Sequence, residues 1–216
     1  MSLKGRWQRV QDRVCTACES VGRDPATVTV LAVTKTVSLD SIAQAIDLGI
    51  SEFAESRLQE SLPKIESLGD HVRWHFIGKL QSNKVKRIAT HFDAVHTFES
   101  AKQVKLSELS GRTIDGLVEV NIAEEPQKSG VFLKGLDETV SCLLTSQSVR
   151  FRGLMTIGPV VADPEQNRIV FRRLAEIGRS SGAEWLSMGM SADFDVAIQE
   201  GATHVRVGSA LFGERN

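Results

Sequence analysis

The sequence predicts an α/β protein that folds as a single (β/α)8 TIM barrel with an extra N-terminal helix. Strand-like and helix-like segments alternate along the 216 residues, and eight segments are strand candidates. Such alternation is typical of parallel strands joined by right-handed helical crossovers, and eight units close a barrel. An open doubly wound sheet is the alternative, but it usually has a Gly-x-Gly-x-x-Gly turn after its first strand, and this sequence has none there.

Each element follows from hydrophobic periodicity. An amphipathic helix over about residues 2–21 precedes a barrel over about 28–216, and we expect one domain. Runs of β-branched and apolar residues predict strands at 28–34, 51–53, 74–77, 93–97, 114–120, 149–155, 184–187 and 204–207. Apolar residues at helical spacing predict intervening helices, among them 39–48, 56–68, 131–144 and 165–178.

Composition narrows the class of function. A net charge of −1 with 6% aromatic residues argues against nucleic acid and anionic membranes as partners. No apolar run approaches bilayer length, and the N-terminus lacks the apolar core of a secretory signal. Three cysteines, an odd number, argue against a disulfide framework and favour the cytoplasm. Cys15 and Cys18 have no second pair to complete a zinc site, so we predict no metal.

Lys35 follows the first strand candidate, 28–34. A lysine at the exit of a buried strand is costly unless it stays hydrated or is used. Partial desolvation lowers the pKa of an amine and makes it a nucleophile for aldehydes, which is what a Schiff-base lysine needs. The alternative is a lysine that simply extends into solvent. In a barrel, Lys35 would lie at the C-terminal end of the strands, where sites of this fold are found.

Two late turns have the composition of an anion site. After the seventh strand candidate, Gly189 lets backbone amides approach a ligand, and Ser191 is a candidate N-cap of the following helix. After the eighth, Gly208 and Ser209 stand where a helix can begin. Free amides at a helix N-terminus attract phosphate, and phosphate sites after strands seven and eight recur in barrels. Ordinary capped turns would have the same residues.

Arg206 lies within the last strand candidate. An inward-facing arginine near a barrel rim needs an anion or an acceptor. The sequence leaves Glu52, Glu55 and Glu119 open as alternative partners. His75, in the strand candidate 74–77, is the one histidine that we can place near the site.

With these motifs assembled, the chain resembles the YggS/PROSC family of pyridoxal phosphate homeostasis proteins. The matching motifs run in order from the first strand to the C-terminus. They are Val33-Thr34-Lys35, Trp74-His75-Phe76-Ile77-Gly78, Leu80-Gln81-Ser82-Asn83-Lys84, Val120-Asn121-Ile122, Gln127-Lys128-Ser129-Gly130, Gly153-Leu154-Met155-Thr156, Leu186-Ser187-Met188-Gly189-Met190-Ser191, Arg206-Val207-Gly208-Ser209 and Phe212-Gly213-Glu214-Arg215.

The resemblance implies an alanine-racemase-like barrel, fold type III among pyridoxal phosphate proteins, and a monomer. It implies that Lys35 holds pyridoxal 5′-phosphate as a Schiff base and that Arg206 faces the pyridine nitrogen. An arginine there disfavours protonation of the ring and so weakens carbanion chemistry. The residues implied to hold the cofactor are Lys35, Ser56, His75, Ser187, Met190, Ser191, Arg206, Gly208 and Ser209. No catalytic residue is implied.

One segment departs from the family pattern. Members usually have Phe-Gly-Glu-Asn-Arg after the second strand, whereas this chain has Phe53-Ala54-Glu55-Ser56-Arg57. Serine keeps a hydroxyl but loses the reach of the amide and one donor, so we expect a weaker or water-mediated contact with the cofactor at Ser56.

Three functions can be weighed. The first is a carrier that holds pyridoxal phosphate and delivers it to apo-enzymes with little turnover. The second is an amino-acid racemase, and the third is a barrel that has lost the cofactor and serves as a protein partner. In racemase-like barrels tyrosine commonly supplies the second acid–base group, and this chain has no tyrosine. Such racemases also have a second, β-rich domain, for which this chain has no corresponding segment. The carrier is therefore preferred.

Overall fold

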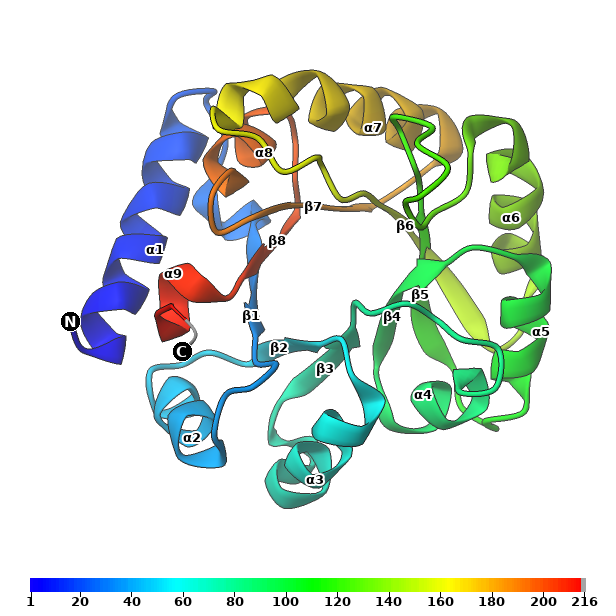
Figure 1. The fold of residues 1–216 in the computed structure, drawn as a ribbon, viewed down its shortest axis with the longest axis horizontal. Coiled ribbons are helices and arrows are strands. Elements are labelled where there is room, and N and C mark those ends of the chain that lie inside the picture. The colour runs from blue at the N-terminus through cyan, green and yellow to red at the C-terminus, as the bar shows by residue number, and fades with distance from the viewer. Residues whose placement is uncertain (215–216) are drawn as a thin grey trace.

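Eight parallel strands pair in chain order and close into a barrel, because β8 pairs back with β1 (Figure 1). The computed structural model describes residues 1–214, so Arg215 of the C-terminal motif and Asn216 lie outside the described part. The strands are β1 Thr29–Val33, β2 Glu52–Glu55, β3 Arg73–Phe76, β4 Ala94–Phe98, β5 Ile114–Glu119, β6 Val149–Met155, β7 Trp185–Met190 and β8 His204–Val207.

The (β/α)8 prediction is confirmed, and each of the eight strand candidates overlaps an observed strand. The largest difference is at β7. The predicted strand ends at Ser187, whereas β7 continues to Met190 and has Ser187 in its middle. Pairing with β8 extends as far as Met190, opposite Arg206, and pairing along a sheet determines where a strand ends.

Helices cover the outside of the strands (Figure 1). They are α1 Leu3–Glu19, α2 Leu39–Asp47, α3 Leu58–Leu68, α4 Val85–His91, α5 Ala101–Glu108, α6 Leu133–Thr145, α7 Arg168–Ser181, α8 Phe194–Gln199 and α9 Ser209–Phe212. The extra N-terminal helix, α1, packs against α8 and α9. Arg13 on α1 donates to the carboxylate of Asp195 on α8, which holds the helix there. Within residues 1–214 no helix has both the length and the apolar character needed to cross a bilayer.

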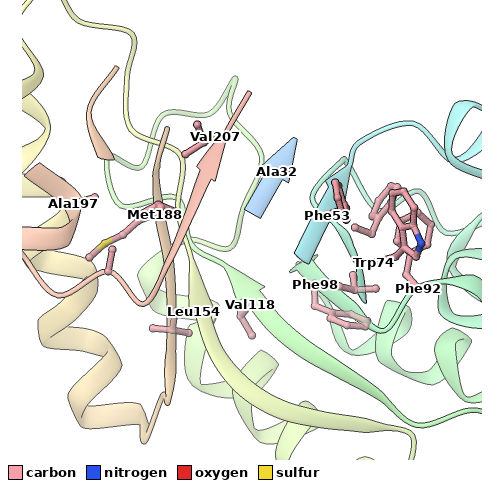
Figure 2. Close-up of a cluster of buried hydrophobic side chains, with 14 of the residues drawn as sticks. Ala32, Phe53, Trp74, Phe92, Phe98, Val118, Leu154, Met188, Ala197 and Val207 are labelled. Carbon is pink, nitrogen blue, oxygen red and sulfur yellow. The ribbon is translucent and has the colours of Figure 1, made fainter. Parts of the chain in front are cut away.

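The main core lies between the strands and the helices. Phe53, Trp74 and Phe92 gather on one side of the barrel, and Met188 packs near Ala197 on another (Figure 2). Successive residues of a strand point to opposite faces, so the alternate positions point into the barrel. These interior positions include a small apolar cluster and several polar side chains. They are Leu31, Val33, Ala54, His75, His96, Ser187 and Arg206.

Candidate functional site

Lys35 lies in a tight turn at the C-terminal end of β1. The amide of Thr34 still donates to the carbonyl oxygen of Ala54 on β2 (3.0 Å), so the two strands stay paired up to this turn. Thr36 has φ +66°, a left-handed conformation that residues other than glycine seldom adopt. The half-buried Lys35 is therefore carried by a turn whose backbone is held in an unusual conformation.

A buried ion pair lies behind this turn. Lys64 on α3 donates to Glu55 Oε1 and to the carbonyl oxygen of Thr34, both at 2.7 Å. The Thr34 hydroxyl donates to the same Glu55 oxygen at 2.8 Å. The ion pair ties α3, β2 and the end of β1 together next to Lys35. This pair was not predicted from the sequence, although a lysine on the apolar face of a predicted helix was a usable signal, because such a lysine needs a partner.

Arg206 is a buried cation whose hydrogen bonds go to neutral oxygens. It is 4% exposed, its Nη1 donates to Ser187 Oγ, and its Nη2 donates to the carbonyl oxygen of Thr156, both at 2.9 Å. Among residues 1–214 no carboxylate oxygen lies within 4 Å of its nitrogens. Burial lowers the pKa of the guanidinium to about 10, against the opposing effect of Glu119 and Asp193. A guanidinium in this environment is suited to receive a further acceptor from a ligand.

None of the three glutamates that the sequence left open forms an ion pair with Arg206. Glu55 is the partner of Lys64 behind the turn, and Glu52 is hydrogen-bonded to His75. Glu119, at the end of β5, is 4% exposed. Burial and the nearby Glu99 raise the pKa of Glu119 to about 7, although Arg206 lowers it.

Two of the predicted cofactor residues point into the barrel interior. Ser187 is fully buried, and its hydroxyl lies between Arg206 Nη1 and His96 Nδ1, each at 2.9 Å. His75 is also fully buried, with its ring between His96 and Glu52. Ser187 therefore contacts Arg206 directly, whereas His75 is linked to Arg206 only through His96 and Ser187. The sequence analysis did not single out His96, which occupies the centre of this arrangement.

The predicted role of Ser191 as N-cap of α8 is wrong, because α8 begins after Asp193. The Ser191 hydroxyl instead accepts from the amides of Gly208 (3.1 Å) and Ala210 (3.2 Å), at the N-terminus of α9. The prediction that a helix begins at Gly208–Ser209 is confirmed, since α9 starts at Ser209. The two late turns therefore meet, and Ser191 connects them.

Gly189 and Met190 complete the turn after β7. Gly189 has φ +85°, and a Cβ at this position would lie 2.5 Å from the Cβ of Ala197. Glycine is therefore required for the close packing of α8 against the strand. The amide of the half-buried Met190 donates to Asp193 Oδ1 at 2.7 Å, which fixes the course of the turn.

Ser56 lies half-buried in the bend between β2 and α3. A Cβ at position 78 would lie 2.1 Å from the Ser56 carbonyl oxygen, so only glycine fits at Gly78. This contact brings the bend at Ser56 against the end of the Trp-His-Phe-Ile-Gly motif.

Two cavities open at the C-terminal end of the barrel. One of about 510 Å³ is lined by Val33 and Thr36 beside the Lys35 turn and by Gly208 at the start of α9. Another of about 280 Å³ is lined by Ile77 and Glu119, among others. The turn that carries Lys35 and the turn that begins α9 thus border the same cavity.

Comparison with known proteins gives consistent matches over almost the whole chain. The family model described as the alanine racemase N-terminal domain matches residues 10–216. The pyridoxal phosphate homeostasis protein of Aquifex aeolicus is 39% identical over 226 aligned positions, which cover 100% of this chain and 99% of the relative. The protein of the same name from Escherichia coli K12 is 37% identical, with 96% of this chain and 94% of the relative covered.

Solved structures agree with this family. An unknown protein from Bifidobacterium adolescentis is 32% identical with a TM-score of 0.89, over 97% of this chain and 94% of that chain. PipY of Synechococcus elongatus, solved with pyridoxal phosphate bound, is 29% identical with a TM-score of 0.81, over 94% and 100% of the two chains. Alanine racemase of Corynebacterium glutamicum shares the fold at 16% identity and a TM-score of 0.66, with 95% of this chain and 60% of the racemase covered. The chain belongs to the family of pyridoxal phosphate homeostasis proteins, built on the barrel of the alanine racemase N-terminal domain.

Proposed function

We propose that this protein binds pyridoxal 5′-phosphate through a covalent bond to Lys35 and takes part in cytoplasmic pyridoxal phosphate homeostasis. In this function it acts as a monomer and releases the cofactor to apo-enzymes with little turnover of its own. The names of its relatives, which match over nearly their full lengths, support this function. The PipY structure with pyridoxal phosphate bound supports it independently.

The observation that carries the proposal is the unbalanced charge of Arg206 at the same end of the barrel as Lys35. A buried guanidinium whose protein partners are neutral oxygens fits a ligand that brings an electron-rich nitrogen to it. A carboxylate at this position would favour a protonated pyridine ring, whereas Arg206 disfavours it. When bound, the cofactor supplies an aldehyde that bonds to amines and a ring that can accept electrons.

The meeting of the two late turns fits the phosphate group. Amides at the start of α9 and the hydroxyl of Ser191 converge there, and Ser209 stands exposed at the first helical position. The amides of Gly208 and Ala210 donate to Ser191 Oγ here, and a phosphate oxygen would replace that acceptor when it binds. Ser56 and Met190, half-buried in the bends after β2 and β7, remain candidates for contact with the ring.

Covalent binding can be tested with an absorbance spectrum of the purified protein after addition of pyridoxal phosphate, followed by borohydride reduction and peptide mapping. We expect a near-visible band and a reduced cofactor on the peptide that contains Lys35. The Lys35→Ala variant should lack the band. Trapping mainly on Lys79, Lys84 or Lys128 would contradict the assignment, and the absence of any band in the wild-type protein would contradict the function itself.

Turnover on free amino acids should be negligible. The arginine at the ring nitrogen weakens carbanion chemistry, and the chain has no tyrosine to act as a second acid–base group. Chiral chromatography of alanine and serine after long incubation with cofactor-loaded protein measures this directly. Saturable racemisation that disappears in Lys35→Ala would instead support the racemase.

A further inference from the structure

Five side chains form a continuous hydrogen-bonded row through the interior of the barrel. Glu52 Oε2 lies 2.5 Å from His75 Nε2, and His75 Nδ1 lies 2.9 Å from His96 Nε2. His96 Nδ1 lies 2.9 Å from Ser187 Oγ, which in turn accepts from Arg206 Nη1 at 2.9 Å. The row therefore leads from the first residue of β2, at the N-terminal end of the barrel, to the guanidinium that we expect to face the cofactor.

When both histidine rings are neutral, the two ends of the row determine the direction of every hydrogen bond in it. Arg206 can only donate, and an ionised Glu52 can only accept. His75 must then carry its proton on Nε2 to donate to Glu52, which leaves Nδ1 as the acceptor. His96 in turn donates from Nε2 to His75 and accepts at Nδ1 from the Ser187 hydroxyl. Every polar atom along the row is satisfied by this one arrangement.

The environment of the row supports this arrangement. His75, His96 and Ser187 are fully buried, so water does not offer them alternative partners. Burial, together with His75, His204 and Arg206 nearby, holds the pKa of His96 well below its ordinary value, which keeps the ring neutral. Neutral rings with one donor and one acceptor each are what the directed row requires. Hydrogen bonds that point the same way also polarise one another.

We propose that Ser187 and His96 are positioning residues for Arg206: the row holds the guanidinium by its Nη1 group and so sets its orientation toward the cofactor ring. This role rests on the proposed function. Ser187 contacts Arg206 directly, whereas His96 acts by fixing the direction in which the Ser187 hydroxyl points. With His96 as its acceptor, Ser187 keeps its lone pairs for the guanidinium. The other Arg206 contact, to the Thr156 carbonyl, cannot fix the plane of the guanidinium by itself.

A satisfied buried network that only stabilises the fold is the competing explanation, and two variants separate the explanations. Ser187→Ala removes the hydroxyl that Arg206 and His96 share, whereas Ser187→Thr keeps it. Thr139→Val is the matched control, because it removes a buried hydroxyl that donates to the Gly135 carbonyl on α6, away from the barrel interior. The folding stability of all three variants should be measured by urea denaturation. Cofactor binding is then compared only under conditions in which each variant is fully folded.

We expect Ser187→Ala to weaken pyridoxal phosphate binding by about three- to tenfold, the equivalent of one misplaced hydrogen bond, and to shift the absorbance maximum of the bound cofactor. Ser187→Thr should restore both values, and Thr139→Val should leave both unchanged. If Ser187→Ala binds the cofactor with the wild-type affinity and spectrum, the positioning role is wrong. If the wild-type protein does not bind the cofactor at all, the proposed function fails instead.

Nitrogen NMR of histidine-labelled protein without cofactor tests the row itself, independently of binding. We expect His75 and His96 both to be neutral and protonated on Nε2, and the His96 signals to move in Ser187→Ala but not in Thr139→Val. A proton on Nδ1 of either ring would overturn the directed row.

Discussion

The two ends of the barrel both carry charged side chains, but they balance them differently. At the N-terminal end, the buried carboxylate of Asp115 pairs with Arg73, with Arg150 at 3.0 Å and with Arg152 at 3.5 Å. Arg152 also pairs with Glu184 at 2.6 Å. Each of these arginines has a carboxylate partner supplied by the protein. At this end three arginines therefore share two carboxylates, both supplied by the protein.

At the C-terminal end Lys64 pairs with Glu55, but the buried Arg206 has no such carboxylate pair among the described side chains. The hydrogen bonds of Arg206 go to neutral oxygens, the hydroxyl of Ser187 and the carbonyl of Thr156, and Glu119 is buried with a raised pKa. A structure keeps such groups buried at a cost, and a ligand can offset that cost when it binds. The comparison indicates that the N-terminal end contributes to stability, whereas the C-terminal end is prepared for a ligand, as is usual for this fold.

The largest expected effect is at the predicted phosphate site. Ser209→Asp places a negative charge at the first residue of α9, where it should repel the phosphate and weaken binding by about a hundredfold or more. An acidic residue at a helix N-terminus does not disfavour the helix, so folding stability should not fall. A cofactor titration measures the change, with Ser209→Asn as the uncharged control. Equal affinity of the wild-type protein for pyridoxal and its phosphate would contradict the site.

The buried Glu119 should make stability depend on pH. Its pKa in the folded protein is about 7, against 4.5 when unfolded, so the folded state holds more protons between these values. Stability contributed by this residue therefore falls as pH rises from 4.5 to 7, by up to about 3 kcal/mol. Glu119→Gln should be more stable than the wild type at pH 8 and similar to it at pH 4 in urea denaturation. A constant difference between the two proteins across this range would refute the shifted pKa.

At the N-terminal end, Asp115→Asn should lower stability without changing cofactor binding. The substitution leaves three arginines without their shared carboxylate, and the arginines can recover part of their hydration because they are partly exposed. We therefore expect a loss of about 2–3 kcal/mol. Glu184→Gln, which removes the exposed partner of Arg152, should cost less than about 1 kcal/mol. A marked loss of pyridoxal phosphate affinity in Asp115→Asn would show that the two ends are not independent.

The smallest effect is expected at Ser56. If the asparagine usual in the family donates a hydrogen bond to the cofactor, Ser56→Asn should tighten binding by up to about tenfold, equivalent to about 0.5–1.5 kcal/mol. The residue lies in a bend between β2 and α3, so stability should change little. Titration of both proteins in the same buffer gives the comparison. Unchanged or weaker binding in Ser56→Asn would mean that this bend does not face the cofactor.

The order of the elements, the barrel and the position of Lys35 at the end of the first strand were all predictable from the sequence. These features depend on local patterns, namely apolar periodicity, glycine and capping residues, which are read over a few neighbouring residues. The start of a helix at Gly208–Ser209 was predictable for the same reason.

Which buried polar groups meet depends on how the chain closes in three dimensions. Closure of the barrel extended β7 to Met190 and turned Ser187 toward Arg206 and His96, residues far from it in the chain. Closure also brought Ser191 to α9 and Lys64 to Glu55. Periodicity indicates that a polar side chain is buried, but several partners of suitable charge exist for each one. The register and spacing of the strands select among them, because a hydrogen bond requires its donor and acceptor to lie about 3 Å apart.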